Sequence, residues 1–161
     1  MAGAAVDAHL DVPFFRQEKK GCGAASVAMV LHYWQQQHPR LVVQSDDLKT
    51  VHEQLYSTDV GGILLSDMRR YFEEVGFHAF ALRAIWAELE EHLAKKRPLI
   101  VGLKKGDDRG ANLHYTVVVG LEEKRVWIND PARRKRKALK RSTFEKRWDS
   151  ADRWMLLAVP R

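Results

Sequence analysis

Residues 22–36 form the strongest hydrophobic pattern in the chain, because apolar side chains occupy almost every position. The apolar members are Ala24, Ala25, Val27, Ala28, Met29, Val30, Leu31, Tyr33 and Trp34. A surface helix confines its apolar side chains to one stripe, whereas a helix that is apolar on all sides is buried. The pattern therefore predicts a buried central helix that begins at Cys22.

Capping and stop signals predict three further helices. Ser45 or Asp46 can cap the first, since short polar side chains accept hydrogen bonds from the first helical turn. Gly76 ends the second and Pro98 follows the third, in agreement with the helix-stopping behaviour of these residue types. We expect these helices at about 45–56, 66–75 and 86–95.

Short apolar runs in the rest of the chain predict strands. We expect them at residues 77–82, 99–103, 114–121, 125–129 and 154–159, after an extended entry at 10–15. The runs 114–121 and 125–129 are separated by three polar residues and should form a hairpin. Helices first and antiparallel strands later indicate an α+β fold, in which an N-terminal helical half with the buried helix packs on a C-terminal antiparallel sheet.

Composition agrees with one globular domain over residues 1–161, with residues 1–9 as a flexible tail. Of the 161 residues, 45% are hydrophobic and 30% are charged, and no apolar run approaches the roughly 20 residues of a membrane span. The single cysteine excludes an internal disulfide and leaves the compartment open. Residues 4–8 could be the remainder of a removed export signal, so cytoplasmic and exported locations both stay open.

Positive charge is concentrated late in the chain. The net charge is +6, and the basic run comprises Arg133, Arg134, Lys135, Arg136, Lys137, Lys140 and Arg141. Such a run can contact nucleic-acid phosphates or an acidic membrane surface, although a solvated loop or sheet edge is the ordinary explanation. Aromatic residues do not alternate with the basic ones, so we do not expect nucleic acid as a partner.

The segment around Cys22 carries the clearest chemical signal. A helix start leaves backbone N–H groups unpaired and carries partial positive charge, which favours a thiolate nucleophile and an oxyanion beside it. Gly21 and Gly23 leave room on either side of the sulfur for a substrate backbone, and Gln17 can supply a second oxyanion donor. A buried structural cysteine is the alternative.

His114 is the candidate base for this thiol, because imidazole titrates near neutral pH. An orienting acceptor is then required, and Asp130 at the end of the paired strand can reach the start of the strand that His114 begins. Asn129 is the second candidate for this role. The sequence Asn129-Asp130-Pro131 is equally typical of a simple turn. A histidine at the start of a strand, such as His114, can also have a purely structural role.

The sequence contains no motif typical of a metal site or a nucleotide site. The spacing of the other histidines does not match that of metal ligands; they are His9, His32, His38, His52, His78 and His92. Glycine-rich phosphate-binding loops and dinucleotide fingerprints are absent as well. We therefore expect no cofactor and no metal.

Three motifs together resemble a known family. Residues 12–17 with 22–33, then His114-Tyr-Thr-Val-Val-Val-Gly120, then Asn129-Asp-Pro131, are similar to the active-site motifs of the bacterial bacteriocin-processing, double-glycine leader cysteine peptidases. Their stand-alone relatives resemble this chain most. The resemblance implies a papain-like fold and thiol-dependent proteolysis, with Cys22 as nucleophile, His114 as base, Asp130 as orienter and Gln17 as oxyanion donor.

The resemblance also implies a peptide or protein substrate, with a membrane transporter or secretion system as a further partner. Transporter-linked members of the family cleave after a Gly-Gly pair in a leader peptide. Those members carry Asp where this chain has Gly21, which leaves open a second possibility. That alternative is a non-catalytic module that binds peptides on the same fold.

Overall fold

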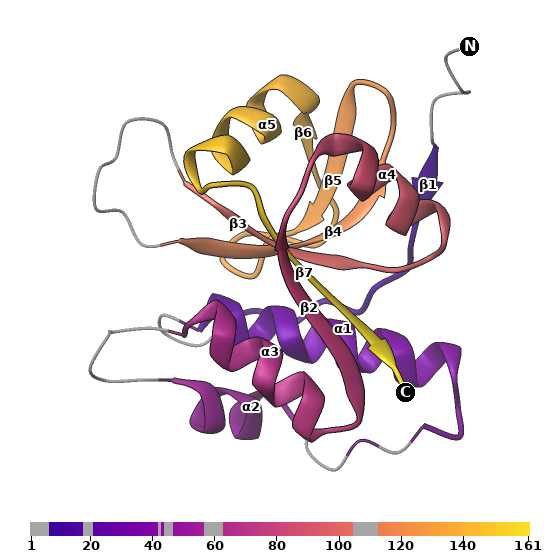
Figure 1. Ribbon diagram of the computed structural model, residues 1–161, viewed down its shortest axis with the longest axis vertical. Helices are drawn as coiled ribbons and strands as arrows, with labels where there is room; N and C mark the ends of the chain where they lie inside the picture. Colours follow the sequence, from indigo (N-terminus) through magenta and orange to yellow (C-terminus); the bar gives the residue numbers. More distant parts are fainter. Residues whose placement is uncertain (1–6, 18–20, 42, 44–46, 57–62, 105–112) are drawn as a thin grey trace.

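The computed structural model describes residues 7–17, 21–41, 43, 47–56, 63–104 and 113–161. Figure 1 shows helices α1, α2 and α3 below the crossing of the strands, and α4 and α5 above it. The helices are α1 (Cys22–Gln37), α2 (Leu48–Leu55), α3 (Leu65–Glu74), α4 (Trp86–Ala94) and α5 (Arg141–Ser150). Among the described residues, no helix combines the length and the apolar character that crossing a membrane requires.

Helix α1 is the buried helix that the sequence predicts. All residues from Gly23 to Leu31 are buried, and the helix packs against strand β4 and helices α2 and α3. Two side chains at its far end make hydrogen bonds to the rest of the fold. The Tyr33 hydroxyl donates at 2.6 Å to the carbonyl of Lys96, in the turn after α4, and Trp34 Nε1 donates at 2.9 Å to the carbonyl of Ala158 in β7. These contacts fix the far end of α1 against the sheet and the turn before β3.

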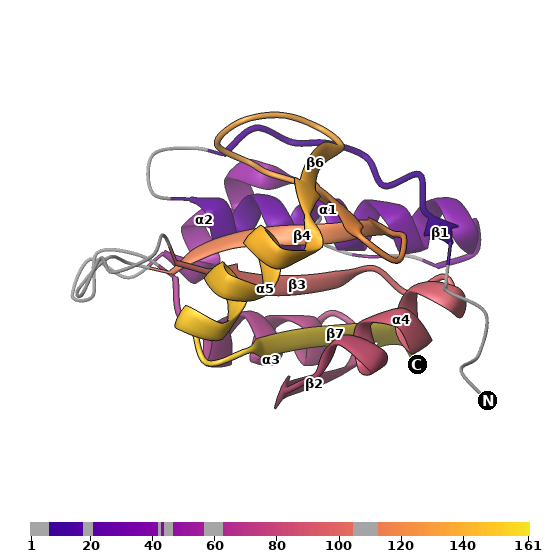
Figure 2. The same ribbon diagram turned by 90° about the horizontal axis from the view of Figure 1, so that it is seen from above.

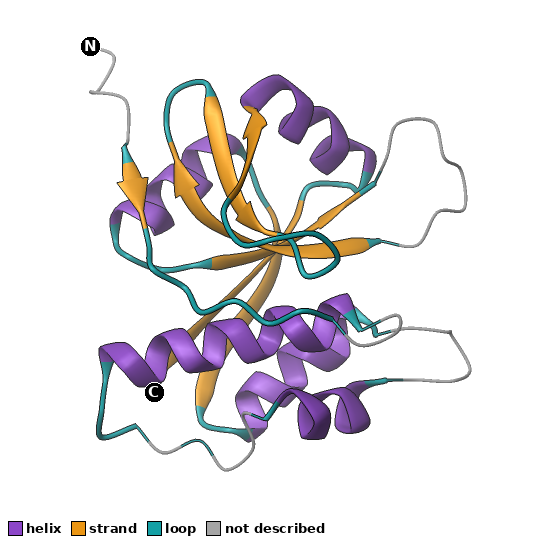
Figure 3. Ribbon diagram, turned by 180° about the vertical axis from the view of Figure 1, so that it is seen from behind, coloured by secondary structure: helices purple, strands orange, loops and turns teal. Residues whose placement is uncertain are grey.

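In the described part of the chain, seven strands form one sheet in the order β2-β7-β3-β4-β5-β6, and β1 pairs with β4. All pairs are antiparallel. The strands are β1 (Ala8–His9), β2 (Phe77–Arg83), β3 (Leu99–Leu103), β4 (His114–Leu121), β5 (Arg125–Asn129), β6 (Lys137–Lys140) and β7 (Trp154–Pro160). The view from behind in Figure 3 shows the N-terminal loop passing between the strands and helix α1.

The predicted α+β architecture is confirmed, and most predicted elements agree with the structure within one or two residues. The cap of α2 differs, because Asp47 accepts from the Thr50 backbone N–H at 3.2 Å. The alternatives Ser45 and Asp46 lie outside the described residues. Strand β2 precedes α4 in the chain, as the sequence predicts, and pairs with β7 at one edge of the sheet.

Three elements were not predicted: β1, β6 and α5. Ala8 and His9 pair with Leu121 and Gly120, whereas we expected residues 1–9 to form a flexible tail. The basic run provides strand β6 at the edge of the sheet and the first residue of α5 (Figure 2). Helix α5 carries just two buried side chains, Phe144 and Trp148, so its sequence has little helical periodicity to recognise.

Candidate active site

Cys22 is the first residue of α1, as the sequence predicts. The preceding Gly21 caps the helix without a side-chain hydrogen bond, so the helix start presents backbone N–H groups and partial positive charge beside the thiol. The backbone N–H of Tyr115 points at the sulfur, with 3.4 Å between the nitrogen and Cys22 Sγ. These features favour negative charge on the half-buried sulfur.

His114 begins β4, the strand that packs against α1. Its Nε2 lies 2.6 Å from Asp130 Oδ1. A hydrogen bond and the charge of the Cys22 side chain also act on the imidazole and favour its protonated form. His114 therefore lies between the thiol and the carboxylate, and its side chain keeps 35% of its surface exposed.

Asp130 follows β5 and is buried, with 7% of its side chain exposed. The antiparallel register of β4 and β5 brings it beside His114, as the predicted hairpin requires. Oδ1 also accepts from the Ala132 backbone N–H at 3.0 Å, and Lys137 Nζ lies 3.8 Å from Oδ2. Asp130 thus orders its own turn and contacts His114 as well, so the two interpretations of this motif are compatible.

The charges of the site stabilise an imidazolium. Burial, the largest single influence, works against the charge on His114, but hydrogen bonds to Asp130 and Cys22 and the charges of these groups raise its pKa to about 9. Burial likewise opposes ionisation of Asp130, yet the hydrogen bond and charge of His114, the Ala132 N–H and Lys137 lower its pKa. Near neutral pH the pair is therefore an imidazolium beside a carboxylate.

Tyr115 and Lys137 contact this group but were not identified in the sequence. Tyr115 contributes its backbone N–H, which donates to Cys22 Sγ; a backbone contact of this kind cannot be predicted from the residue type. Burial and then the charge of Cys22 raise the pKa of the Tyr115 hydroxyl to about 12, so this side chain stays neutral. Lys137 is one of seven basic residues in a run, and only the path of the chain shows that it faces Asp130.

Gln17 lies on the loop before α1 and is half-buried. Its backbone N–H donates to the Pro131 carbonyl at 3.0 Å, so this loop runs beside the turn that contains Asp130. The side-chain Oε1 is buried, and no group in the described part of the chain hydrogen-bonds to it. The structure thus brings Gln17 to the neighbourhood of the site, while its role as an oxyanion donor stays a prediction.

Asn129, the second candidate orienter, has different partners. It is fully buried, its Nδ2 donates to the Val12 carbonyl at 3.1 Å, and its Oδ1 accepts from the Arg136 backbone N–H at 3.0 Å. Its side chain faces away from His114 because alternate residues of a strand point to opposite sides. The contact with His114 is made by Asp130 instead.

Gly23 was expected to leave space for a substrate, and the structure corrects this expectation. Gly23 is buried, and a Cβ atom at this position would lie 3.0 Å from Ile63 Cγ2 and 3.1 Å from Met68 Sδ. The missing side chain therefore allows close packing of α1 against the start of α3. Access to the sulfur from this side is blocked by protein.

A group with metal-ligand spacing lies outside the site. Among the described residues, the ligand atoms of Asp7, His9 and Glu122 are within 4.8 Å of one another. His9 Nε2 lies 3.1 Å from Asp7 Oδ1 and 3.3 Å from Glu122 Oε1. Polar contacts within the group therefore account for its geometry.

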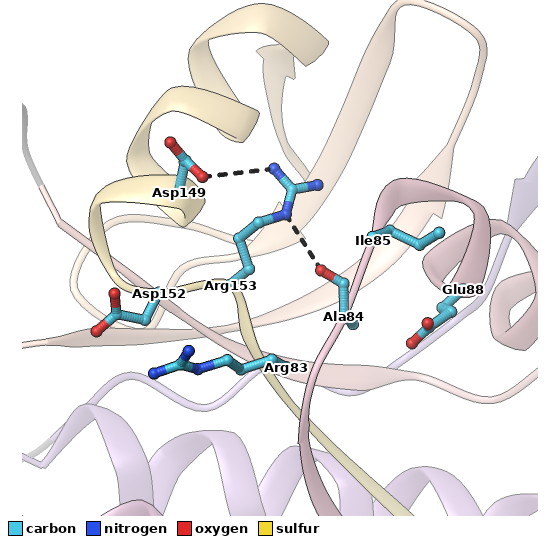
Figure 4. Close-up of a pocket in the computed structure, with 7 residues that line it drawn as sticks. All are labelled: Arg83, Ala84, Ile85, Glu88, Asp149, Asp152 and Arg153. Carbon is cyan, nitrogen blue, oxygen red and sulfur yellow. Dashed lines mark hydrogen bonds and ion pairs between the residues drawn. The ribbon is translucent and has the colours of Figure 1, made fainter.

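Two cavities lie away from Cys22. One of about 350 Å³ is found where β2 leads into α4 and where α5 leads into β7 (Figure 4). There Arg153 Nε donates to the Ala84 carbonyl at 3.1 Å, and Arg153 Nη1 lies 3.9 Å from Asp149 Oδ1. The other, of about 600 Å³, lies beside Lys140 and the start of α5. Neither of these cavities is lined by Cys22, His114 or Asp130.

Solved structures of peptidase domains share this fold. A C39-like peptidase from Bacillus anthracis aligns with a TM-score of 0.73 and 18% identity over 96% of this chain and 98% of that one. The peptidase domain of the Streptococcus transporter ComA aligns with a TM-score of 0.72 and 19% sequence identity, over 94% of this chain and 100% of that domain. A double glycine motif protease from an AMS/PCAT transporter, solved in complex with the leader peptide, has a TM-score of 0.68 and 24% sequence identity. The alignment covers 96% of this chain and 95% of that one.

Sequence comparison leads to the same group. The chain is 30% identical over 138 residues, or 83% of its length, to the lactococcin-G-processing and transport ATP-binding protein LagD of Lactococcus lactis subsp. lactis. It spans 17% of the length of that relative. Residues 9–154 match the sequence profile of the Peptidase_C39 like family. The expected kinship with bacteriocin-processing peptidases is thereby confirmed, and this chain belongs to the Peptidase_C39 like family.

Proposed function

We propose that this protein is a cysteine peptidase that cleaves a peptide bond by attack of the Cys22 thiolate. The observation that supports this proposal most directly is the position of His114, which hydrogen-bonds to Cys22 on one side and to Asp130 on the other. Thiol, imidazole and carboxylate in this order are the groups that activate a cysteine nucleophile. Membership of a peptidase family agrees with this chemistry.

In the proposed reaction His114 takes the thiol proton, and the Cys22 sulfur attacks the carbonyl carbon of the scissile bond. The resulting oxyanion is stabilised by backbone N–H groups at the start of α1 and by the side-chain amide of Gln17. The imidazolium gives its proton to the leaving amine as the C–N bond breaks, which leaves a thioester on Cys22. Water, deprotonated by His114, then attacks the thioester and releases the carboxylate product and the thiol.

Asp130 has two tasks in this scheme. Its hydrogen bond to Nε2 keeps Nδ1 directed at the sulfur, and its charge stabilises the imidazolium. The Ala132 N–H and Lys137 in turn hold the Asp130 carboxylate in its ionised form. The Asp130 carboxylate is therefore ionised and in contact with His114 before the substrate binds.

A peptide or protein is the proposed substrate, and processing of a leader peptide is the proposed task. Two relatives support it by their names, since one processes lactococcin G and another was solved as a double glycine motif protease with a leader peptide. A membrane transporter or secretion system is the corresponding partner. The papain-like mechanism is carried over from the resemblance of the motifs.

The test is cleavage of a peptide library by the purified chain, compared with its Cys22→Ala variant. We expect cleavage by the parent chain, with products identified by mass spectrometry, and none by the variant. Iodoacetamide should alkylate Cys22 faster than free cysteine near neutral pH. Equal cleavage by the variant would refute the mechanism. A chain that binds peptides without products, and whose thiol reacts no faster than free cysteine, would be the non-catalytic binding module.

A further inference from the structure

The N-terminal segment, residues 8–17, is attached to the sheet near its start and to the turn after β5 at its end. The Leu10 N–H donates to the Val119 carbonyl at 2.7 Å, Asn129 binds the Val12 carbonyl, and the Gln17 N–H donates to the Pro131 carbonyl. The segment starts as β1 on the edge of β4 and ends beside the Asp130 turn. Its attachment therefore decides where Gln17 lies.

Arg136 connects this segment to the basic run through two hydrogen bonds, and a third joins it to Asn129. Its Nη1 donates to the Leu10 carbonyl at 3.3 Å and its Nη2 lies 3.0 Å from His9 Nδ1. Its backbone N–H donates to Asn129 Oδ1 at 3.0 Å, and Asn129 in turn holds the Val12 carbonyl. One residue thus contacts the segment at two consecutive positions directly and at a third through Asn129.

The backbone of Arg136 is itself unusual. Its φ angle is 52°, in the left-handed region where a side chain costs about 1 kcal/mol or more relative to glycine. Residues keep this conformation where surrounding contacts stabilise it. For Arg136, the stabilising contacts are those of the guanidinium with the N-terminal segment and the backbone hydrogen bond to Asn129.

His9 is adapted to receive the guanidinium. Because a guanidinium only donates, His9 Nδ1 must accept, and the ring proton is then on Nε2, which faces Asp7 and Glu122. The ring packs edge-on against Trp127 with 4.6 Å between ring centroids. It also lies over Gly120, where a Cβ atom would come within 2.7 Å of Nδ1.

We propose that Arg136 is a positioning residue of the site: it fastens the N-terminal segment to the end of β5 and thereby holds Gln17 beside the Asp130 turn. The proposal rests on the proposed peptidase function for its effect on rate. It assigns a structural task to a basic residue that is otherwise explained as part of a charged surface. Its neighbour Arg134 is equally exposed and takes part through its backbone carbonyl, which accepts from the Asp130 N–H.

The experiment compares Arg136→Ala and Arg136→Gly with Arg134→Ala as the charge-matched control. Arg136→Gly relieves the left-handed strain, so it keeps the turn while it removes the guanidinium. We expect both Arg136 variants to lower kcat about tenfold with little change in KM, as a displaced oxyanion donor would. Hydrogen exchange at the Leu10 and Gln17 amides should accelerate in these variants and stay unchanged in Arg134→Ala.

A double-mutant cycle with Gln17→Ala separates positioning from general destabilisation. If Arg136 acts through Gln17, Arg136→Gly should lower kcat no further in the Gln17→Ala background. A full additional loss there, or unchanged exchange at Leu10 and Gln17, overturns the proposal. Failure of the proposed function is distinguishable, because it would appear as a parent chain with no Cys22-dependent cleavage, while the exchange measurement would still decide whether Arg136 holds the segment.

Discussion

Replacing Asp130 by Asn is the sharpest test of the electrostatics of the site. The substitution keeps the shape of the side chain and removes its charge. His114 then faces a neutral amide instead of the carboxylate that lies 2.6 Å from Nε2, and it loses the charge-assisted hydrogen bond and the Coulombic attraction that favour the imidazolium. Burial, which acts against the charged form, remains, and so do the smaller contributions of Cys22 that favour it. We therefore expect the pKa of His114 to fall from about 9 toward the ordinary value of 6.5.

The consequence for reactivity follows from the population of the imidazolium. At about pH 7.5 nearly every parent molecule carries a protonated His114, whereas a pKa near 6.5 leaves about a tenth of the variant molecules in this form. If the thiolate is stabilised as an ion pair with the imidazolium, alkylation of Cys22 should slow about tenfold. The difference should vanish well above pH 9, where the histidine is neutral in both proteins.

Stability should respond with a defined sign. The folded pKa of His114 is raised above its unfolded value, so the stabilisation is fully present below pH 6.5 and is lost as pH rises through about 9. The interval between these pKa values corresponds to about 3 kcal/mol as an upper bound. Because 35% of the side chain is exposed, solvent screening reduces the expected loss to about 1–2 kcal/mol. Asp130→Asn should lack most of this pH-dependent change.

The assay is the rate of iodoacetamide alkylation from pH 5 to pH 10, paired with urea unfolding over the same range. Asp152→Asn is the matched control, since Asp152 is exposed and its φ of 64° is a conformation that asparagine tolerates. We expect the control to reproduce the parent profile. An Asp130→Asn profile that superimposes on the parent would show that the carboxylate does not set the protonation of His114, and the reasoning would be wrong.

Two further substitutions probe the support of the site. Asn129→Ala should lower the free energy of unfolding by about 1–3 kcal/mol, because it leaves the Val12 carbonyl without its buried partner; an unchanged urea midpoint would contradict this. Gly23→Ala should cost about 1–3 kcal/mol through contacts with Ile63 and Met68, and should leave alkylation of Cys22 in the folded protein unchanged. Slower alkylation without destabilisation would instead return Gly23 to a role in access to the sulfur.

The places of Cys22, His114 and Asp130 could be predicted because local rules determine them. A cysteine before an apolar run lies at a helix start, where the structure has it. A short polar link between two apolar runs makes a hairpin, which brings the start of one strand beside the end of the next, and His114 meets Asp130 for this reason. Neither inference needs knowledge of distant parts of the chain.

Gly23 and Asn129 show where such rules fail. A glycine beside a reactive cysteine suggests open space, but the neighbours of Gly23 come from residues about forty positions away. Asn129 and Asp130 are both suitable acceptors, and the choice between them depends on which side of β5 each side chain faces. The pairing of Val117 with Asn129 fixes which side that is, and this register is set only when β4 and β5 pair in the folded sheet.

The basic run shows the same limit more strongly. As a composition it suggests a charged surface, yet its members have separate tasks once the chain is folded: Lys137 faces the Asp130 carboxylate, Arg136 holds the N-terminal segment, and Lys135 Nζ lies 3.3 Å from Asp11 Oδ1. Two of these contacts join the basic run to the N-terminal segment, and the third joins β6 to the turn after β5. Because these three side chains interact within the protein, less of the positive charge of the run is available to attract a polyanion. Binding to nucleic acid or to an acidic membrane would then depend on the remaining exposed residues, such as Arg133, Arg134 and Lys140, and would fall steeply with salt.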